Sequence, residues 1–345
     1  MEESIKKKNK IKLFLKKTVK IIDPVIKELL GSYINKRTKK IINYQILTGG
    51  KRIRPALTIL SCQLVGGKIK DVLYPAAGLE ILHNYSLIID DIIDHGELRR
   101  ERPTCWVKFG KSIAQCLGTD YSATAFQAAH QSKNPILISE IFAKTIKTGV
   151  DGEILDILFE QKGREDEPYI VKNRYLKITD KDYLKMASRK TASLFQTCCE
   201  VGGICAGAKP KEIRALRNYG LNLGIAFQIR DDILDIFGKR KSFGKKIGKD
   251  IIERKLGNII ILYALKKLSQ SQKEKFLKIM RKRRITSRDI KEAMELIKKT
   301  KSYQKAYLLG KKYILKVKQS LKALPQNKWN DILRDIADFV MEREG

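Results

Sequence analysis

Two apolar stretches of the chain have the spacing of helices and contain the same acidic pattern. The first reads LEILHNYSLIIDDIID and the second reads LGIAFQIRDDILDIFG. Each has aspartates in the order Asp-Asp-x-x-Asp, namely Asp90, Asp91 and Asp94 in the first and Asp231, Asp232 and Asp235 in the second. Residues four apart on a helix are neighbours, with Cβ atoms about 5–6 Å apart, so the first and last aspartate of each motif share a face. Carboxylates this close in an apolar setting repel, and protonation or a divalent cation must relieve the repulsion.

All donor atoms of the two motifs are carboxylate oxygens. Such ligands suit Mg²⁺, which keeps several of its waters and is commonly shared with phosphate groups. If the two helices face each other, the aspartates form an acidic mouth in which Mg²⁺ clamps a diphosphate. A single motif is a weak indication, because solvated helix faces also produce it. Two copies within apolar helices are a much stronger one.

The rest of the chain predicts an all-α protein. Long runs have helical spacing and are rich in Leu, Ile, Ala, Lys and Glu, whereas few segments alternate with the period of strands. Proline is scarce, at 8 of 345 residues, and no Pro/Gly/Ser-rich linker interrupts the chain. We therefore predict one all-helical domain of many helices over residues 1–345.

The chain is strongly basic, with 71 Lys and Arg against 38 Asp and Glu and a formal net charge of +33. This balance favours a polyanionic partner, such as nucleic acid, an anionic membrane surface or a phosphorylated substrate. The lysines are spread along the chain, so a generally lysine-rich composition is an equally good interpretation. They are not interleaved with aromatic residues, and no nucleic-acid-binding signature is present, so we do not expect nucleic acid as a partner.

The first 20 residues predict a basic helix or extension. Ile11, Leu13, Phe14, Leu15 and Val19 can form one apolar face. We expect this face to pack on the body of the protein, with peripheral contact to a membrane as the alternative. The segment lacks the apolar region of a signal peptide, and no run of about 18 or more apolar residues predicts a membrane span.

The six cysteines show no CxxC pair, and Cys198 and Cys199 are adjacent. With so few histidines, we expect no zinc site. Reduced thiols in a cytoplasmic protein are the default expectation.

Several motifs occur in the order found in the trans-isoprenyl diphosphate synthases, and the chain resembles that family from about residue 20 to its end. They are GGKRIRP (49–55), DDIIDHGELRRERPT (90–104), GEILDI (152–157), KTASL (190–194), FQIRDDILDIFG (227–238), GKKIGKDIIERKLGN (244–258) and DIADFVMERE (335–344). The resemblance implies the all-helical isoprenoid synthase fold, a bundle of many mostly antiparallel helices around a central apolar cavity, together with a Mg²⁺ cofactor and a homodimer. It also implies condensation of isopentenyl diphosphate with an allylic diphosphate.

The resemblance assigns a catalytic set around the aspartate motifs. Asp90, Asp94 and Asp231 would hold Mg²⁺. The other aspartates, Asp91, Asp232 and Asp235, complete the catalytic set. Further contacts to the departing diphosphate would come from Arg99, Lys190 and Lys245, while Gln228 and Thr191 would face the allylic cation.

A second, metal-independent site for isopentenyl diphosphate is implied at Lys51, Arg54, His83 and Arg100. Without the resemblance, His83 is better interpreted as a core histidine, and the Lys51–Arg54 stretch as a solvated basic turn. No side chain is assigned as a general base, because the released diphosphate lies near the proton that is lost.

Tyr85 and Ser86, five and four residues before the first motif, match the positions that limit chain length in this family. An aromatic residue followed by a small one resembles archaeal geranylgeranyl diphosphate synthases, so we expect geranylgeranyl diphosphate as the product. A farnesyl diphosphate synthase or a bifunctional farnesyl/geranylgeranyl enzyme is the alternative for the product, and ordinary helix packing the alternative for Tyr85. A terpene cyclase, a non-catalytic partner subunit and a nucleic-acid binder are weaker hypotheses.

Two further features are noted. Glu153 stands where the family commonly has Gln. Residues 161–182 are strongly charged and predict a surface loop.

Overall fold

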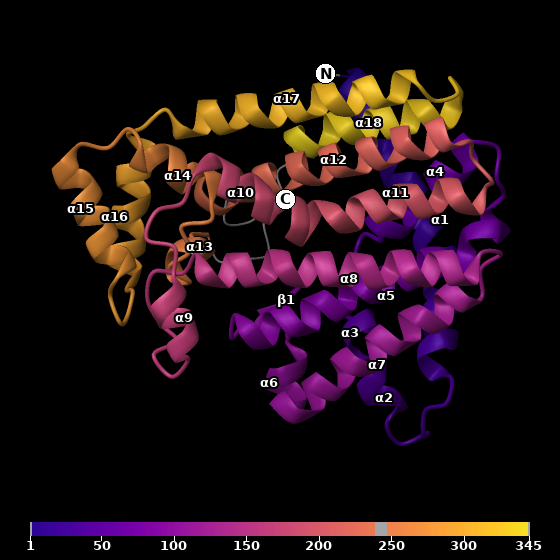
Figure 1. Ribbon diagram of the computed structural model, residues 1–345, viewed down its shortest axis with the longest axis horizontal. Coiled ribbons are helices and arrows are strands. Elements are labelled where there is room, and N and C mark those ends of the chain that lie inside the picture. The colour runs from indigo at the N-terminus through magenta and orange to yellow at the C-terminus, as the bar shows by residue number, and fades with distance from the viewer. Residues whose placement is uncertain (1, 239–246, 344–345) are drawn as a thin grey trace. The chain divides into compact units, whose positions relative to one another are not determined.

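The computed structural model describes residues 2–238 and 247–343, and its elements confirm the predicted all-α class (Figure 1). Strand structure within these residues is limited to a short antiparallel hairpin, β1 (Leu98–Arg99) and β2 (Arg102–Pro103), and an isolated bridge between Glu160 and Lys255. Lys245, a predicted diphosphate contact, lies outside the described residues.

The chain divides into two compact units. Unit 1 comprises residues 1–147, 194–221 and 316–339, and unit 2 comprises residues 148–193, 222–315 and 340–345. Five of the described helices contribute residues to both units, namely α8 (Pro135–Leu158), α11 (Ser193–Cys205), α12 (Pro210–Phe237), α17 (Ser302–Lys322) and α18 (Lys328–Glu342). One domain over residues 1–345 stays a prediction.

Unit 1 is built around helix α5, which contains the first aspartate motif. The other helices of this unit are α1 (Glu2–Gly31), α2 (Lys39–Ile42), α3 (Tyr44–Leu47), α4 (Ile53–Leu64), α6 (Cys105–Phe109), α7 (Lys111–His130) and most of α11 (Ser193–Cys205). Helix α5 (Ile69–Ile93) packs on α1, α4 and α7, and most of its residues between Val72 and Asn84 are buried. It ends at Asp94, whose backbone N–H donates to the carbonyl of Asp90. A buried helix therefore carries the acidic motif to the point where it ends.

Unit 2 contains a series of short helices with well-defined starts. They are α9 (Pro168–Asn173), α10 (Asp180–Ala187), the π-helical turn η1 (Ser188–Ala192), α13 (Lys249–Ile252), α14 (Ile259–Leu265), α15 (Gln270–Met280) and α16 (Ser287–Lys298). Capping boxes begin α10, α15 and α16, at Thr179, Ser269 and Thr286 respectively. In these boxes the cap side chain accepts from the third backbone N–H of the helix, which satisfies a donor that lacks a partner within the helix.

The predicted loop over residues 161–182 is partly wrong. It lies at the surface as expected, but it contains the six-residue helix α9, none of whose residues is buried, and the first residues of α10. A helix that buries nothing leaves no apolar periodicity in the sequence, which explains why the pattern did not predict it.

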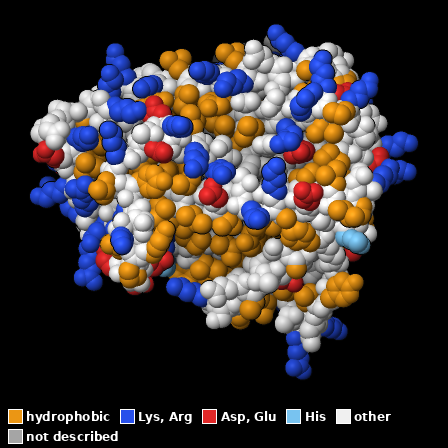
Figure 2. Space-filling view, in the orientation of Figure 1, with side chains coloured by type: hydrophobic (Ala, Val, Ile, Leu, Met, Phe, Trp, Pro, Cys, Tyr) orange, Lys and Arg blue, Asp and Glu red, His pale blue; other side chains and the backbone are white. Residues whose placement is uncertain are grey.

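Helix α1 packs only in part as the sequence favoured, because Leu13 of the expected apolar face is exposed. Ile11 and Ile22 are buried, whereas Leu13 is 56% exposed. Across the described chain, no helix combines the length and apolar character needed to cross a membrane. Figure 2 shows Lys and Arg side chains scattered over the visible face instead of gathered in one patch.

Two helical glycines give a matched test of the packing in this fold. A Cβ on Gly202 of α11 would lie 2.3 Å from the carbonyl oxygen of Thr58 in α4, whereas a Cβ on Gly149 of α8 would meet no atom within 4 Å. Because α4 must move to admit it, we expect Gly202→Ala to lower the free energy of unfolding by about 1–3 kcal/mol. Gly149→Ala should raise it by up to about 1 kcal/mol through helix propensity. Urea unfolding measures both, and equal effects would contradict the close α4–α11 approach.

Candidate active site

The three aspartates of the first motif differ in burial. Asp91 is 4% exposed, and it accepts hydrogen bonds of 2.7 Å from both Nε and Nη2 of Arg99. Burial alone would lower the pKa of Arg99, but the hydrogen bonds and charge of Asp91 raise it overall. Asp90 and Asp94 are half-buried. The first and last aspartates therefore keep access to solvent, while the middle one forms an ion pair with Arg99.

The basic loop before α4 surrounds a buried guanidinium. Arg52 has a left-handed backbone, with φ of 50°, and its side chain is 1% exposed. Its Nε donates to Asp23 Oδ1 at 2.7 Å, and its Nη1 donates to Glu80 Oε1 at 3.3 Å. Its guanidinium also donates to the carbonyls of Gly49 and Ile46. The interpretation of this stretch as a solvated turn is therefore wrong at Arg52, which ties α1, the loop and α5 together.

Three of the predicted isopentenyl diphosphate residues lie in one electrostatic neighbourhood of unit 1. Burial lowers the pKa of His83 well below its usual value, and the charges of Arg54 and Arg100 lower it further. Both effects favour the neutral form of the imidazole. The Arg54 guanidinium lies over the ring of Phe195, 5.1 Å from its centroid, and Arg100 donates to Thr48 Oγ1 at 3.3 Å and to the carbonyl of Gly49. The fourth residue, Lys51, is exposed beside the buried Arg52.

The two chain-length candidates lie on α5, one turn before the first motif. Tyr85 is half-buried, and burial, with the charge of Asp90, raises the pKa of its hydroxyl. A Cβ on Gly118 of α7 would lie 3.9 Å from the Tyr85 ring, so the ring approaches α7. Ser86 Oγ donates to the carbonyl of His83 at 2.9 Å, which turns this hydroxyl back onto its own helix.

In the second motif the buried aspartates hold the chain that follows α12. Asp232 Oδ2 accepts from the backbone N–H of Ile259 at 2.9 Å, at the start of α14. Asp235 Oδ1 accepts from the N–H of Lys249 at 2.8 Å, at the start of α13. Burial raises the pKa of Asp232 and of Asp235, and the charge of Asp250 raises both further. Asp231 is one-third exposed and is the accessible member of this motif.

Gln228 and Thr191 come together in unit 2, whereas their orientation toward an allylic cation stays a prediction. Thr191 Oγ1 donates to the side-chain carbonyl of Gln228 at 2.6 Å, and Gln228 Nε2 donates to Asp232 Oδ1 at 2.8 Å. The amide is therefore oriented from both ends. Because its carbonyl already accepts from Thr191, one lone pair is left for another partner.

Lys190 lies between two carboxylates. Its Nζ is 2.6 Å from Glu153 Oε2 and 2.7 Å from Asp156 Oδ2, and the buried Lys255 also contacts Asp156, at 3.0 Å. Glu153, which stands where the family commonly has Gln, therefore forms an ion pair with Lys190. A Cβ on Gly152 would lie 2.2 Å from the backbone nitrogen of Lys190, so α8 and the π-helical turn are in close contact.

The residues fit Mg²⁺ by the chemistry of their donors. Asp90, Asp94 and Asp231 are partly exposed carboxylates, and hard oxygen ligands favour Mg²⁺ over zinc. Among the described residues, no three His, Cys, Asp or Glu side chains gather into a preformed metal cluster. The first motif lies in unit 1 and the second in unit 2, so that the two face each other stays a prediction.

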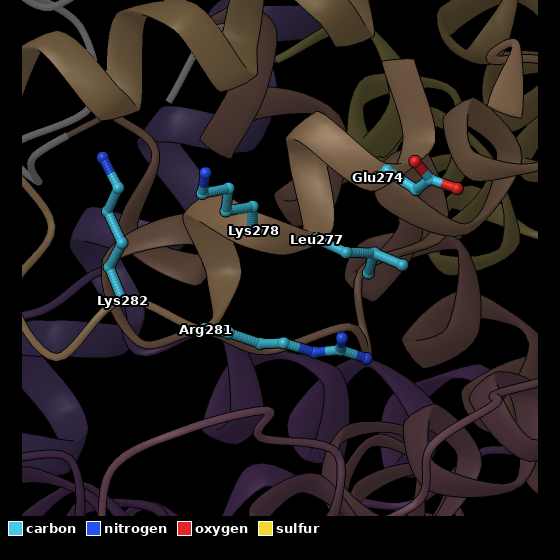
Figure 3. Close-up of a pocket in the computed structure, with 5 residues that line it drawn as sticks. All are labelled: Glu274, Leu277, Lys278, Arg281 and Lys282. Atoms are coloured by element: carbon cyan, nitrogen blue, oxygen red, sulfur yellow. The ribbon is translucent and has the colours of Figure 1, made fainter. Parts of the chain in front are cut away.

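A surface depression on α15 is a different feature (Figure 3). It is lined by Glu274, Leu277, Lys278, Arg281 and Lys282, none of which belongs to the predicted site. Three of its five lining residues are cations and one is apolar, and the two acidic motifs lie elsewhere in the chain. We therefore do not assign the active site to it.

Several residues of the site were missed by sequence reasoning. They are polar partners of the predicted residues, namely Asp23, Glu80, Asp156, Lys255 and Arg343. One signal was present in the sequence. Glu80 lies in the apolar run LEIL, three residues before His83, and an acid in that setting must either be protonated or pair with a cation.

Replacing Glu80 by Gln tests the buried pair with Arg52. Removing one partner of a buried ion pair typically costs about 3–5 kcal/mol of stability, and we expect about 2 kcal/mol here because Asp23 still pairs with Arg52. Urea unfolding of Glu80→Gln measures this loss. Glu140→Gln, on the exposed surface of α8, is the control and should change stability by less than about 0.5 kcal/mol. Equal stability of the two variants would show that the pair is not coupled to the fold.

Comparison with known proteins identifies the family to which these motifs belong. Residues 35–297 match the family described as polyprenyl synthetase, a range that contains the basic loop and both aspartate motifs. A short chain isoprenyl diphosphate synthase of Methanocaldococcus jannaschii is 34% identical over 342 residues, which cover 98% of this chain and 98% of the relative. A geranylgeranyl diphosphate synthase of Saccharolobus solfataricus is 33% identical over 342 residues, covering 96% and 98%.

Solved structures of similar proteins have the same fold as this chain. Geranylgeranyl pyrophosphate synthetase from Pyrococcus horikoshii superposes with a TM-score of 0.87 at 32% identity, covering 98% of this chain and 99% of that one. A polyprenyl synthase from Caulobacter crescentus, complexed with calcium and isoprenyl diphosphate, gives a TM-score of 0.87 at 27% identity, covering 98% of each chain. The chain belongs to the polyprenyl synthetase family of prenyltransferases.

Proposed function

We propose that this protein is a short-chain prenyl diphosphate synthase that condenses isopentenyl diphosphate with an allylic diphosphate. The observation that supports this most strongly lies within unit 1. Accessible carboxylates at Asp90 and Asp94 suit a metal-bound diphosphate, while the cations Lys51, Arg54 and Arg100 suit a second diphosphate without metal. Two different ways of holding an anion are what a reaction between two diphosphates requires.

The basic cluster would bind isopentenyl diphosphate. Arginine presents its N–H groups as a planar fork that matches phosphate oxygens, and Lys51 adds a point charge. Burial and the nearby arginine charges lower the pKa of His83, which favours a neutral imidazole that can take part in a hydrogen bond. The buried Arg52–Glu80 pair keeps the loop folded so that Lys51 faces outward.

The acidic motifs would hold the allylic substrate through metal. Asp90, Asp94 and Asp231 would bind Mg²⁺, which neutralises the charge that develops on the leaving diphosphate. A lysine ammonium has three donors, so Lys190 can keep Glu153 and Asp156 and still donate to that diphosphate. Arg99 is committed to Asp91 by two hydrogen bonds, and we propose that it reaches the diphosphate with a remaining N–H. Lys245 is proposed from the resemblance alone.

The reaction needs no side chain as a general base, because the released diphosphate can accept the proton. The bond between the allylic carbon and its diphosphate oxygen breaks, and the electron pair leaves with the diphosphate. The double bond of isopentenyl diphosphate then forms the new carbon–carbon bond, and a proton passes from the resulting cation to a diphosphate oxygen. Gln228, oriented by Thr191 and Asp232, would place its carbonyl dipole toward the cation.

We propose geranylgeranyl diphosphate as the main product. The support is the Tyr85–Ser86 pair before the first motif, together with the names of archaeal relatives similar over nearly the whole chain. Farnesyl diphosphate, alone or as a second product, is the alternative. From the resemblance we also propose a cytoplasmic homodimer.

Incubation with labelled isopentenyl diphosphate, each allylic primer and Mg²⁺, followed by product chromatography, tests the function. We expect elongation that stops when a chelator removes the metal. Asp90→Ala or Asp231→Ala should lower turnover about a hundredfold or more, because charge stabilisation of the leaving group is lost. Asp166→Ala, at an exposed position, should keep the wild-type rate. Absence of elongation with every primer would favour a non-catalytic partner subunit, and near-normal rates in the motif variants would contradict the metal assignment.

Product length is tested at Tyr85. Replacing Tyr85 by Ala removes the ring that would block the growing chain, so we expect products longer than geranylgeranyl diphosphate. Tyr169→Ala changes an aromatic residue that is 72% exposed and should leave the product unchanged. The same chromatography measures both variants. An unaltered product from Tyr85→Ala would show that the ring serves helix packing and does not limit product length.

A further inference from the structure

Arg343, the residue that follows α18, contacts the second aspartate motif. Arg343 Nη2 donates to Asp231 Oδ1 at 2.7 Å and to the carbonyl of Phe227 at 3.1 Å. The guanidinium also lies over the Phe227 ring, 3.8 Å from its centroid. The Arg343 side chain is 11% exposed and that of Asp231 is 33% exposed. A fixed cation thus already contacts the carboxylate that we assign to metal.

The backbone of Arg343 is held as well as its side chain. Arg230, which is 9% exposed, donates through Nε to the carbonyl of Arg343 at 3.0 Å. Two residues earlier, Met341 is buried, and a Cβ on Gly310 of α17 would lie only 2.4 Å from its Cε. Met341 and Arg343 are therefore held in place by packing and hydrogen bonds, and the Arg343 guanidinium lies against Asp231. All of these residues belong to unit 2.

We propose that Arg343 forms an ion pair with Asp231 in the metal-free protein and competes with the divalent metal for this carboxylate. The inference rests on the proposed function, which assigns Asp231 to metal. A carboxylate next to a guanidinium is already neutralised, and a metal that binds there meets a fixed positive charge. That repulsion exceeds the gain from orienting a partly exposed carboxylate by one hydrogen bond. Metal binding at the second motif is thereby coupled to loosening of the C-terminal segment.

The direct test is binding of Mn²⁺ alone, followed by electron paramagnetic resonance, to the full-length wild type and to Arg343→Gln. We expect the variant to bind Mn²⁺ about fivefold more tightly, or about 1 kcal/mol at 1.4 kcal/mol per tenfold. Arg343→Lys keeps the charge but loses the fork, so its affinity should lie between the two. Arg334→Gln removes an equal charge from an exposed site on α18, the helix that precedes Arg343, and is the control, expected to match the wild type.

A second readout does not require a variant of Arg343. Hydrogen exchange of the C-terminal peptide in the wild type should rise when Mn²⁺ is added, and the rise should be absent in Asp231→Asn. Unchanged or weaker Mn²⁺ binding by Arg343→Gln would overturn the proposal and make Arg343 a residue that orients the ligand. If Asp231→Asn binds Mn²⁺ as well as the wild type does, the metal assignment itself fails, which is a different result.

Discussion

The cost of taking charge out of water is the constraint on which both units depend. Arg52 is almost fully buried between Asp23 and Glu80, and Asp91 is almost fully buried against Arg99. Each of these buried charges in unit 1 has a fixed partner of opposite sign, as the low polarity of an interior requires. These pairs define where the neighbouring charges lie. Lys51 is exposed beside Arg52, and Asp90 keeps access to solvent beside Asp91.

Both aspartate motifs combine buried aspartates that stabilise the fold with accessible aspartates that can bind metal. In the first, the middle aspartate is structural and the outer pair is accessible. In the second, Asp232 and Asp235 accept from backbone N–H groups at the starts of α14 and α13, which leaves Asp231 accessible. Adjacent helical residues point about 100° apart, so one short motif can contribute both a buried anchor and a ligand. The raised pKa values of Asp232 and Asp235 reflect burial, in keeping with an anchoring role.

The sequence predicted the helical class, the identity of both motifs and the neighbourhood of His83, Arg54 and Arg100. Helical periodicity and local spacing are enough for the helical class and the two motifs, whereas the grouping of His83, Arg54 and Arg100 came from the resemblance to the family. It did not predict the partners. Asp23 reaches Arg52 from a different helix, and Arg343 reaches Asp231 from the far end of the chain. The resemblance assigned Arg99 to a diphosphate, whereas the structure pairs it with Asp91, a contact that depends on the β1–β2 hairpin. Long-range pairs of this kind leave no periodic signal, and neither does a solvent-exposed helix such as α9.

The central claim is that carboxylates from α5 and α12 hold Mg²⁺ against one diphosphate while a separate basic cluster holds the other. The most direct measurement is a crystal structure of the protein with Mg²⁺, isopentenyl diphosphate and an unreactive thio analogue of an allylic diphosphate. The account predicts metal ions that bridge the analogue to Asp90, Asp94 and Asp231, with isopentenyl diphosphate bound without metal at Lys51, Arg54 and Arg100. Metal or analogue bound away from these aspartates would contradict it.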